Sequence, residues 1–331
     1  MKQPAMFCLF IICLYACNGL TDTQQENRNQ YELVNNWPQL PDSFPLGDVT
    51  GIDVDTSGNV FVFHRASREW KADVPKDPIT EKTVLELDKQ TGKIINSWGD
   101  SIFLMPHGLT VDFNDNVWVT DLGLHQVFKF THNGQLLMTL GQAGVSGSDR
   151  LHFNKPTSVA VTPGGSFYVA DGYGNSRIIK FSPKGKFLFQ WGTQGKNEGQ
   201  FQIPHDISLD KKGNVYVADR ENKRVQVFDS TGKFLLNISD TSFGKIYSVE
   251  TDTIHNTLLA SDYVSTITET KGSNIIVLDS ADVIQKKYGR SGSYKGPVCR
   301  YHNITVDKEG NVYVGDILDN RIQKFRYKKK G

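Results

Sequence analysis

The chain has 331 residues, with 37 Lys and Arg against 36 Asp and Glu, and its formal net charge is +1. A nearly neutral chain lacks the excess of basic residues that nucleic-acid-binding domains use, so no nucleic-acid partner is expected. Hydrophobic residues make up 38% of the chain, including 19 Phe and 12 Tyr. That composition is sufficient for several sheets that pack face to face.

The N-terminus has the pattern of a secretory signal peptide. Met1-Lys2 is followed by an apolar stretch from Met6 to Ala16 and then by small and polar residues. The stretch is too short to span a bilayer. We assign residues 1–20 to the signal peptide and 21–36 to an N-terminal segment, and we expect no transmembrane segment and a location outside the cell or in the lumen of secretory granules.

Six copies of one pattern fill the rest of the chain. Each copy has an alternating apolar run, a polar turn with Gly or Asn and a second run of β-branched or aromatic residues, which predicts a β-hairpin. The copies begin at Ile52, Leu109, Val159, Ile207, Val249 and Ile304. Their spacing of roughly 40 to 57 residues is the length of a four-stranded propeller blade. The sequence therefore predicts an all-β, six-bladed propeller over residues 37–327, with a basic tail at 328–331.

The last copy lacks the pattern for a fourth strand. It stops after its third run, at 321–325, whereas the other copies mostly continue into a fourth. We expect the segment that begins at Tyr31 to supply the missing outer strand, because this pairing closes the ring and covers a sheet edge. The protein is expected to be a monomer.

One position of the repeat carries three histidines. The residue two before each copy's start is expected at the mouth of the channel, where the chain enters the innermost strand. This position holds Thr50, His107, Thr157, His205, Tyr247 and His302 in blades one to six. Histidine in alternate blades suits zinc bound by three imidazoles with an open fourth position. The alternative is three hydrogen-bonded histidines at blade entries, and the other five histidines are predicted to be structural or surface groups.

The residues just after the second strand of each blade are expected at the same mouth. Here blade one has Arg65, blade three has Tyr173 and blade four has Arg220. The alternative for each arginine is an ion pair with a loop carboxylate, and for the tyrosine a packing role. The aspartates that recur at the end of this strand are predicted to accept hydrogen bonds in turns. They are Asp121, Asp171, Asp219, Asp262 and Asp316.

The motifs around these positions resemble a known family. The segments are VFVFHR at 60–65, LMPHGLTVD at 104–112, VADGYGNSRI at 169–178 and VADRENKRVQVF at 217–228. They resemble the peptidyl-α-hydroxyglycine α-amidating lyase, which is the lyase core of peptidylglycine α-amidating monooxygenase, and the repeats are similar to NHL repeats. The resemblance covers about residues 37–327.

The resemblance implies roles for individual residues. It implies zinc binding by His107, His205 and His302, substrate contacts from Arg65 and Arg220, and a catalytic base at Tyr173. It also implies a structural calcium ion, bound by the carbonyls of Ile52 and Leu109 and by a carboxylate at the position of Asn303. Because an amide oxygen brings no charge, calcium binding is expected to be weaker here than with an aspartate.

The implied activity is that of a zinc-dependent carbon-nitrogen lyase. Such an enzyme cleaves peptidyl-α-hydroxyglycine to an α-amidated peptide and glyoxylate during peptide-hormone or neuropeptide maturation. No copper monooxygenase half precedes the repeats, so we expect a stand-alone secreted lyase whose substrate comes from a separate copper monooxygenase. Of the two glycosylation sequons, we favour Asn237, because Asn303 adjoins the expected metal.

Two other functions fit parts of the pattern. An inactive secreted propeller that binds a peptide or a protein partner is consistent with Asn303 and its sequon. A calcium-dependent, lactonase-like hydrolase on a similar propeller is the second alternative. Three histidines match a calcium site poorly, because calcium prefers oxygen ligands.

Overall fold

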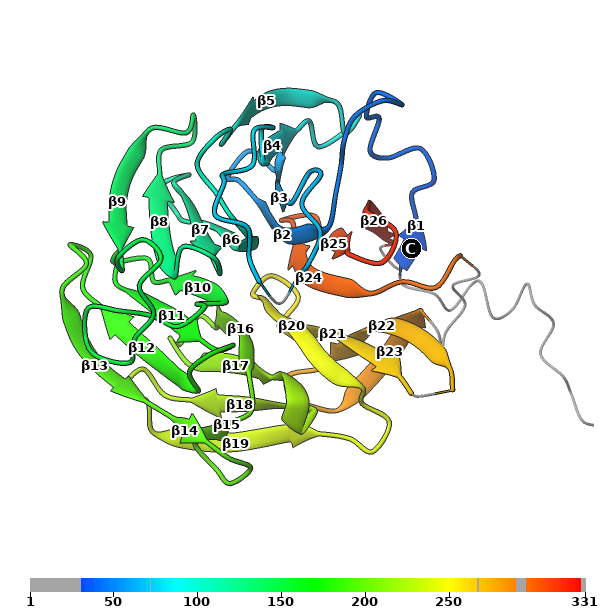
Figure 1. Ribbon diagram of the computed structural model, residues 1–331. Coiled ribbons are helices and arrows are strands. Elements are labelled where there is room, and N and C mark those ends of the chain that lie inside the picture. Colours follow the sequence, from blue (N-terminus) through cyan, green and yellow to red (C-terminus); the bar gives the residue numbers. More distant parts are fainter. Residues whose placement is uncertain (1–30, 72, 267, 290–295, 329–331) are drawn as a thin grey trace, which may run out of the picture.

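Six antiparallel four-stranded sheets surround a central channel in the computed structural model, which describes residues 31–71, 73–266, 268–289 and 296–328 (Figure 1). The expected signal peptide, the segment 21–30 and most of the basic tail lie outside these residues. The predicted six-bladed propeller is therefore confirmed. No helix in the described ranges has the length and apolar character needed to cross a membrane.

Each blade is a meander that starts at the channel and runs outward. Blades one to three contain β2 (Val49–Val54), β3 (Val60–His64), β4 (Val84–Leu87) and β5 (Ile94–Trp98); β6 (Pro106–Val111), β7 (Val117–Asp121), β8 (Gln126–Phe130) and β9 (Leu136–Leu140); and β10 (Ser158–Val161), β11 (Phe167–Asp171), β12 (Arg177–Phe181) and β13 (Phe187–Trp191). Blades four to six contain β16 (Pro204–Leu209), β17 (Val215–Asp219), β18 (Arg224–Phe228) and β19 (Phe234–Ser239); β20 (Lys245–Asp252), β21 (Thr257–Ser265), β22 (Thr270–Leu278) and β23 (Ile284–Gly289); and β24 (Tyr301–Val306), β25 (Val312–Asp316), β26 (Arg321–Tyr327) and β1 (Tyr31–Leu33). A short parallel pair, β14 (Thr193–Gln194) and β15 (Gln200–Phe201), precedes blade four, and the 3-10 turn η1 (Arg220–Asn222) follows β17.

Hydrophobic contacts between neighbouring blades form the core. The alternating residues of each strand point to both faces of its sheet, and both faces meet an adjacent blade. The buried apolar side chains accordingly gather into six clusters, each shared by two neighbouring blades. The largest side chains among them are aromatic, such as Phe63 and Phe103, whose rings lie 4.9 Å apart between blades one and two.

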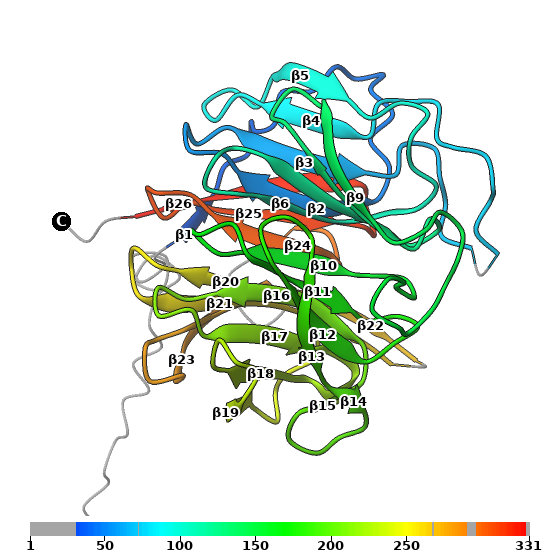
Figure 2. The same cartoon turned by 90° about the vertical axis from the view of Figure 1, so that its left-hand side faces the viewer.

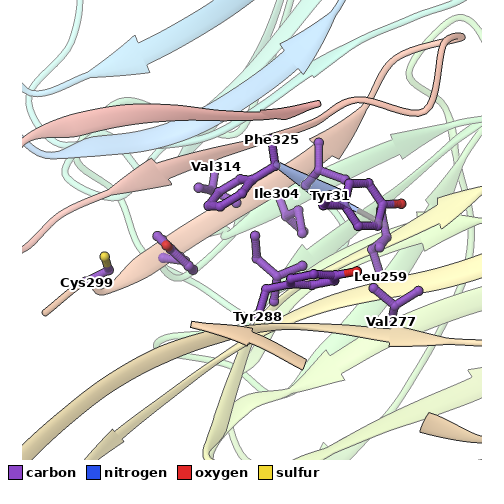
Figure 3. Close-up of a cluster of buried hydrophobic side chains, with 11 residues drawn as sticks. Tyr31, Leu259, Val277, Tyr288, Cys299, Ile304, Val314 and Phe325 are labelled. Carbon is purple, nitrogen blue, oxygen red and sulfur yellow. The ribbon is translucent and has the colours of Figure 1, made fainter. Parts of the chain in front are cut away.

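The ring is closed by the first described strand. β1 pairs antiparallel with β26, with Tyr31 opposite Tyr327 and Leu33 opposite Phe325. Tyr31 is 7% exposed and packs its ring edge-on against Tyr288 of blade five at 5.2 Å (Figure 3). β1 thus completes the sixth sheet, as the missing fourth strand of the last repeat predicts, and also contributes to the interface with blade five.

Removal of the Tyr31 side chain tests this closure. Tyr31→Ala leaves a cavity between blades five and six and is expected to lower the free energy of unfolding by about 3 kcal/mol. Leu137→Ala, on the exposed outer strand β9, is the matched control and is expected to change it by less than about 0.5 kcal/mol. Urea unfolding followed by tryptophan fluorescence measures both. Equal midpoints for the two variants would show that β1 does not hold the ring in solution.

Candidate active site

A bulge in the innermost strand presents each of the three histidines. The pairing registers of β6, β16 and β24 shift between Pro106 and Leu109, between Pro204 and Asp206, and between Tyr301 and Asn303, respectively. His107, His205 and His302 lie within these shifts and have no cross-strand partner. A bulge redirects the side chain of the extra residue, so the three imidazoles turn away from the blade interfaces and toward the channel axis.

Aspartates of the second strands fix the segments that lead into these bulges. Asp121 accepts the backbone N–H groups of Leu104 and Met105 at 2.8 and 2.9 Å. Asp219 accepts the N–H of Gln202 at 2.7 Å, and Asp316 accepts that of Arg300 at 2.8 Å. Each anchored residue lies two or three positions before a histidine. The prediction that these aspartates are hydrogen-bond acceptors is confirmed.

The outer nitrogen of each histidine bonds to the backbone of the next blade. The Nδ1 atoms of His107, His205 and His302 lie 2.7, 2.6 and 2.8 Å from the carbonyl oxygens of Thr157, Tyr247 and Thr50, respectively. These carbonyls belong to the same repeat position in blades three, five and one. A carbonyl can only accept, so Nδ1 carries the proton and Nε2 presents its lone pair to the axis.

The three histidines form a compact, buried group. Their ring centroids are 4.6 to 4.8 Å apart, and they offer three ligand atoms within 4.8 Å of one another. They are 1 to 3% exposed, and burial lowers the pKa of His107 to about 3 and those of His205 and His302 well below their usual value. Within the described ranges, the buried Nε2 of His107 has no hydrogen-bond partner. Neutral imidazoles with an unpartnered inward nitrogen fit a zinc ion.

Tyr173 and Arg220 lie directly against the histidines. Arg220, at the start of η1, donates from Nη1 to the Tyr173 hydroxyl at 3.0 Å, and that hydroxyl lies 3.3 Å from Nε2 of His205. The Arg220 guanidinium is 5.1 Å from the centroids of both Tyr173 and Tyr247. Nη2 of Arg220 also forms an ion pair with Oε1 of Glu221 at 3.0 Å. The structure thus brings together residues from blades three and four that the sequence placed on one rim.

Arg65 reaches the same site from blade one. Its side chain is 3% exposed; Nε donates to the carbonyl of Pro106 at 3.0 Å and Nη1 to Asp48 at 2.8 Å. Pro106 directly precedes His107, so this hydrogen bond links the arginine to the strand that carries this histidine. Each of the two predicted arginines therefore has the carboxylate partner that the structural alternative requires, and each also faces the histidine group.

Sequence reasoning missed two side chains near the mouth. Trp70 lies in the long loop between β3 and β4, which crosses the centre of the ring in Figure 1 and stands out from one face in Figure 2. It is 49% exposed, yet its ring lies 5.6 Å from that of Tyr173 and 5.1 Å from the Arg65 guanidinium. Arg300 precedes His302 by two residues and packs on Tyr247. The sequence held one signal for each residue. Trp70 is a lone tryptophan in a polar loop, and Arg300 occupies the position that Met105 and Ile203 hold in the other two blades with a histidine.

The residues expected to bind calcium line the channel below the histidines. Asn303 accepts the N–H of Ile52 through its side-chain oxygen at 2.8 Å, and its amide nitrogen donates to Asp206 at 3.3 Å. Asp206 also accepts hydrogen bonds from Ser158 and from the N–H of Val249. The side-chain oxygen of Asn303 is thus neutral and already accepts a hydrogen bond, and the carboxylate beside it belongs to Asp206, so calcium at this position stays a prediction.

The channel continues from this layer to the opposite face. Its lower part forms a cavity of about 730 Å³ between the six innermost strands.

A second possible ligand group, formed by Asp55, Glu86 and His132, lies on that opposite face, because Asp55 follows the far end of β2. Nε2 of His132 is 3.3 Å from Asp55 and 3.6 Å from Glu86, which is the geometry of an ion pair.

Substitution of Asn303 by aspartate tests the calcium prediction. Asn303→Asp brings a second carboxylate beside Asp206, and without a cation the repulsion between two buried carboxylates is expected to lower the melting temperature. If calcium binds there, added calcium reverses the loss through linkage between binding and folding. Melting curves of unglycosylated protein in EDTA and in calcium measure this. Asn237→Asp, at an exposed position on β19, is the control. A loss that calcium does not reverse would argue against the site.

Known proteins are similar to this chain in their repeats, their fold and their sequence. Residues 103–130, 153–181 and 201–228 match the NHL repeat family. A solved streptogramin B lyase covers 90% of the chain with a TM-score of 0.59 at 15% identity, a likeness that concerns the fold alone. Peptidyl-glycine α-amidating monooxygenase B of Xenopus laevis is 36% identical over 92% of the chain. The chain spans only 38% of that longer protein.

A relative of similar length is more informative. A probable peptidyl-α-hydroxyglycine α-amidating lyase of Caenorhabditis elegans is 33% identical over 85% of this chain and 83% of its own length. From this relation, together with the propeller fold, we conclude that the chain belongs to the peptidyl-α-hydroxyglycine α-amidating lyase family.

Proposed function

We propose that the protein is a zinc-dependent lyase that cleaves peptidyl-α-hydroxyglycine to a peptide amide and glyoxylate. One observation carries the proposal: the Tyr173 hydroxyl lies between Nε2 of His205 and Nη1 of Arg220, at 3.3 and 3.0 Å. This places an acid–base group within reach of any substrate bound at the three histidines. Membership of the lyase family supports the same reaction.

The reaction needs a base at the substrate hydroxyl and a proton at the departing nitrogen. Tyr173 is the proposed base, because the guanidinium of Arg220 donates to its oxygen and stabilises negative charge there. The hydroxyl proton passes to this oxygen, the C–O bond becomes the aldehyde of glyoxylate, and the C–N electrons move to the nitrogen. The nitrogen takes up a proton and leaves as the peptide amide.

The three histidines are the proposed zinc ligands. Bound zinc would supply a Lewis acid beside the base, which lowers the pKa of a coordinated hydroxyl. The bonds from Nδ1 to backbone carbonyls hold each imidazole in the tautomer that offers Nε2. Burial keeps the histidines neutral, and in this form they are ligands.

Arg65 and Arg220 are the proposed substrate contacts at the reacting end. Arg220 acts through its bond to Tyr173. Arg65 commits Nε and Nη1 to Pro106 and Asp48, while Nη2 makes no hydrogen bond to a residue of the described ranges. This nitrogen is the donor we assign to a substrate oxygen. Trp70 lies over both Arg65 and Tyr173 and limits the access of water to them.

We further propose that this reaction takes place in the secretory pathway or after secretion. The protein that carries it out is proposed to be monomeric and glycosylated. Asn237 supports the glycan, because it is exposed on the outermost strand of blade four. A separate copper monooxygenase is the proposed source of the hydroxylated substrate. Asn303, by contrast, bonds to Ile52 within the channel, which does not suit a glycan.

Glyoxylate release from a synthetic peptidyl-α-hydroxyglycine tests the function. Purified protein loaded with zinc is expected to release one glyoxylate for each peptide amide formed. A binding protein without catalysis releases none at any zinc concentration. A lactonase-like hydrolase would instead open lactones with calcium alone. Metal content and lactone hydrolysis are measured on the same preparation. Either result would refute the lyase.

Loss of a histidine tests the metal ligands. His205→Ala removes one of three neutral ligands and is expected to reduce bound zinc far below one per chain and to abolish turnover. His152→Ala, which removes an imidazole bonded to Asp149 outside the channel, is the control and is expected to retain both. Zinc is measured by atomic absorption after dialysis. Normal zinc content in the His205 variant would disprove the assignment.

Loss of a single hydroxyl tests the base. Tyr173→Phe keeps the ring contacts with His107 and Trp70, so the fold and the zinc content are expected to persist while kcat falls roughly 10²-fold or more. Tyr168→Phe removes a hydroxyl of the same blade as Tyr173, which donates to the carbonyl of Ser230 in blade four away from the histidines, and is expected to leave kcat within about threefold. If Tyr173→Phe behaved like this control, Tyr173 would have a packing role.

A further inference from the structure

A third arginine lies at the mouth of the channel, beside the histidine group. Arg300 belongs to the segment that enters β24, two residues before His302, and Asp316 holds its backbone N–H at 2.8 Å. Its guanidinium lies 5.2 Å from the ring centroid of Tyr247 and 4.8 Å from that of Tyr263. The Tyr247 ring in turn contacts His205 and His302, at 5.0 and 5.8 Å. One aromatic ring therefore separates this guanidinium from the proposed metal.

The hydrogen bonds of Arg300 differ from those of the other two arginines. Arg65 pairs with Asp48 and Arg220 pairs with Glu221, whereas no carboxylate pairs with Arg300 in the part of the chain that the structure describes. Its Nη2 donates to the Tyr247 hydroxyl, and its buried Nε has no hydrogen-bond partner among the residues that the structure describes. Nη1 makes no hydrogen bond to a described residue.

The half-buried guanidinium of Arg300 is a positive charge without a carboxylate partner among the described residues. Burial without a carboxylate costs free energy, which a bound anion would offset. The rings of Tyr247 and Tyr263 pack against the guanidinium, and Nη1 is left to donate a charge-assisted hydrogen bond to a carboxylate. Arg220, on the other side of Tyr247, adds positive charge nearby.

We propose that Arg300 forms a carboxylate-binding subsite of this active site and selects substrates by a carboxylate that lies one ring away from the histidines. The inference rests on the proposed function, because a peptidyl-α-hydroxyglycine brings such a group at its C-terminus. An acidic side chain at the residue before the hydroxyglycine offers the same chemistry. Arg65 and Arg220 then remain free to act on the reacting atoms.

Binding of unreactive peptides tests the subsite without turnover. A peptide that ends in glycine lacks the hydroxyl and cannot be cleaved, so its affinity for the zinc-loaded protein can be measured by calorimetry. Four ligands separate the two sources of the carboxylate: peptides that end in Gln-Gly, Glu-Gly, Gln-glycinamide and Glu-glycinamide. The variants are Arg300→Gln and Arg300→Lys, with Arg150→Gln as a matched control, because Arg150 packs on Phe187 away from the mouth. Melting curves and zinc content verify each fold.

The proposal expects Arg300→Gln to weaken binding of a carboxylate-bearing peptide about tenfold or more. Arg300→Lys is expected to lose less, and Arg150→Gln nothing. A loss seen with Gln-Gly but absent with Gln-glycinamide assigns the C-terminal carboxylate, and a loss confined to the Glu peptides assigns the side chain. Equal affinities of wild type and Arg300→Gln for all four peptides, or an equal loss for all four, would overturn the subsite. A wild-type protein that binds in this selective way but releases no glyoxylate would refute the lyase alone.

Discussion

The bonds from the three histidine side chains to the backbone of the next blade are the constraint on which the site depends. Each Nδ1 atom bonds to a carbonyl of the following blade, and the last of these bonds joins His302 in blade six to Thr50 in blade one. All six blades therefore share in the geometry of the three imidazoles. A displacement of any blade moves either a histidine or the carbonyl that orients one. Closure of the ring by β1 is thus a condition for the arrangement of the three imidazoles as well as for stability.

The electrostatics of the mouth follow from the placement of charges on the two sides of the histidine layer. Arginines lie above it, and their positive charge adds to burial in lowering the pKa values of the imidazoles. Carboxylates lie below it, where burial raises the pKa of Asp53 to about 6 and also raises that of Asp206. The arginines of the upper side are thus not paired with the carboxylates of the lower side, and Arg65 and Arg220 pair instead with Asp48 and Glu221. This separation supports a catalytic role for the mouth alone.

The sequence predicts the ring and the position of the histidines because both repeat with the blade. A hairpin pattern in six copies determines the architecture, and one position of that pattern identifies His107, His205 and His302. It does not predict the bulges that turn these side chains inward, since a bulge depends on the pairing of two strands. Trp70 and Arg300 escape prediction for a related reason. Their contacts with Tyr173 and Tyr247 are made between different blades, and no periodic signal marks a loop or a single exceptional residue.

The layer below the histidines indicates how this chain joins its blades without a charged ligand at Asn303. A carboxylate does follow one of the three histidines, but it is Asp206, after His205. Its oxygens accept hydrogen bonds from Ser158 of blade three, Val249 of blade five and Asn303 of blade six. Asn303 in turn bonds to Ile52 of blade one. These hydrogen bonds tie together the innermost strands of five blades, as a central cation would. These donors offset part of the hydration that the Asp206 carboxylate loses on burial, although burial still raises its pKa.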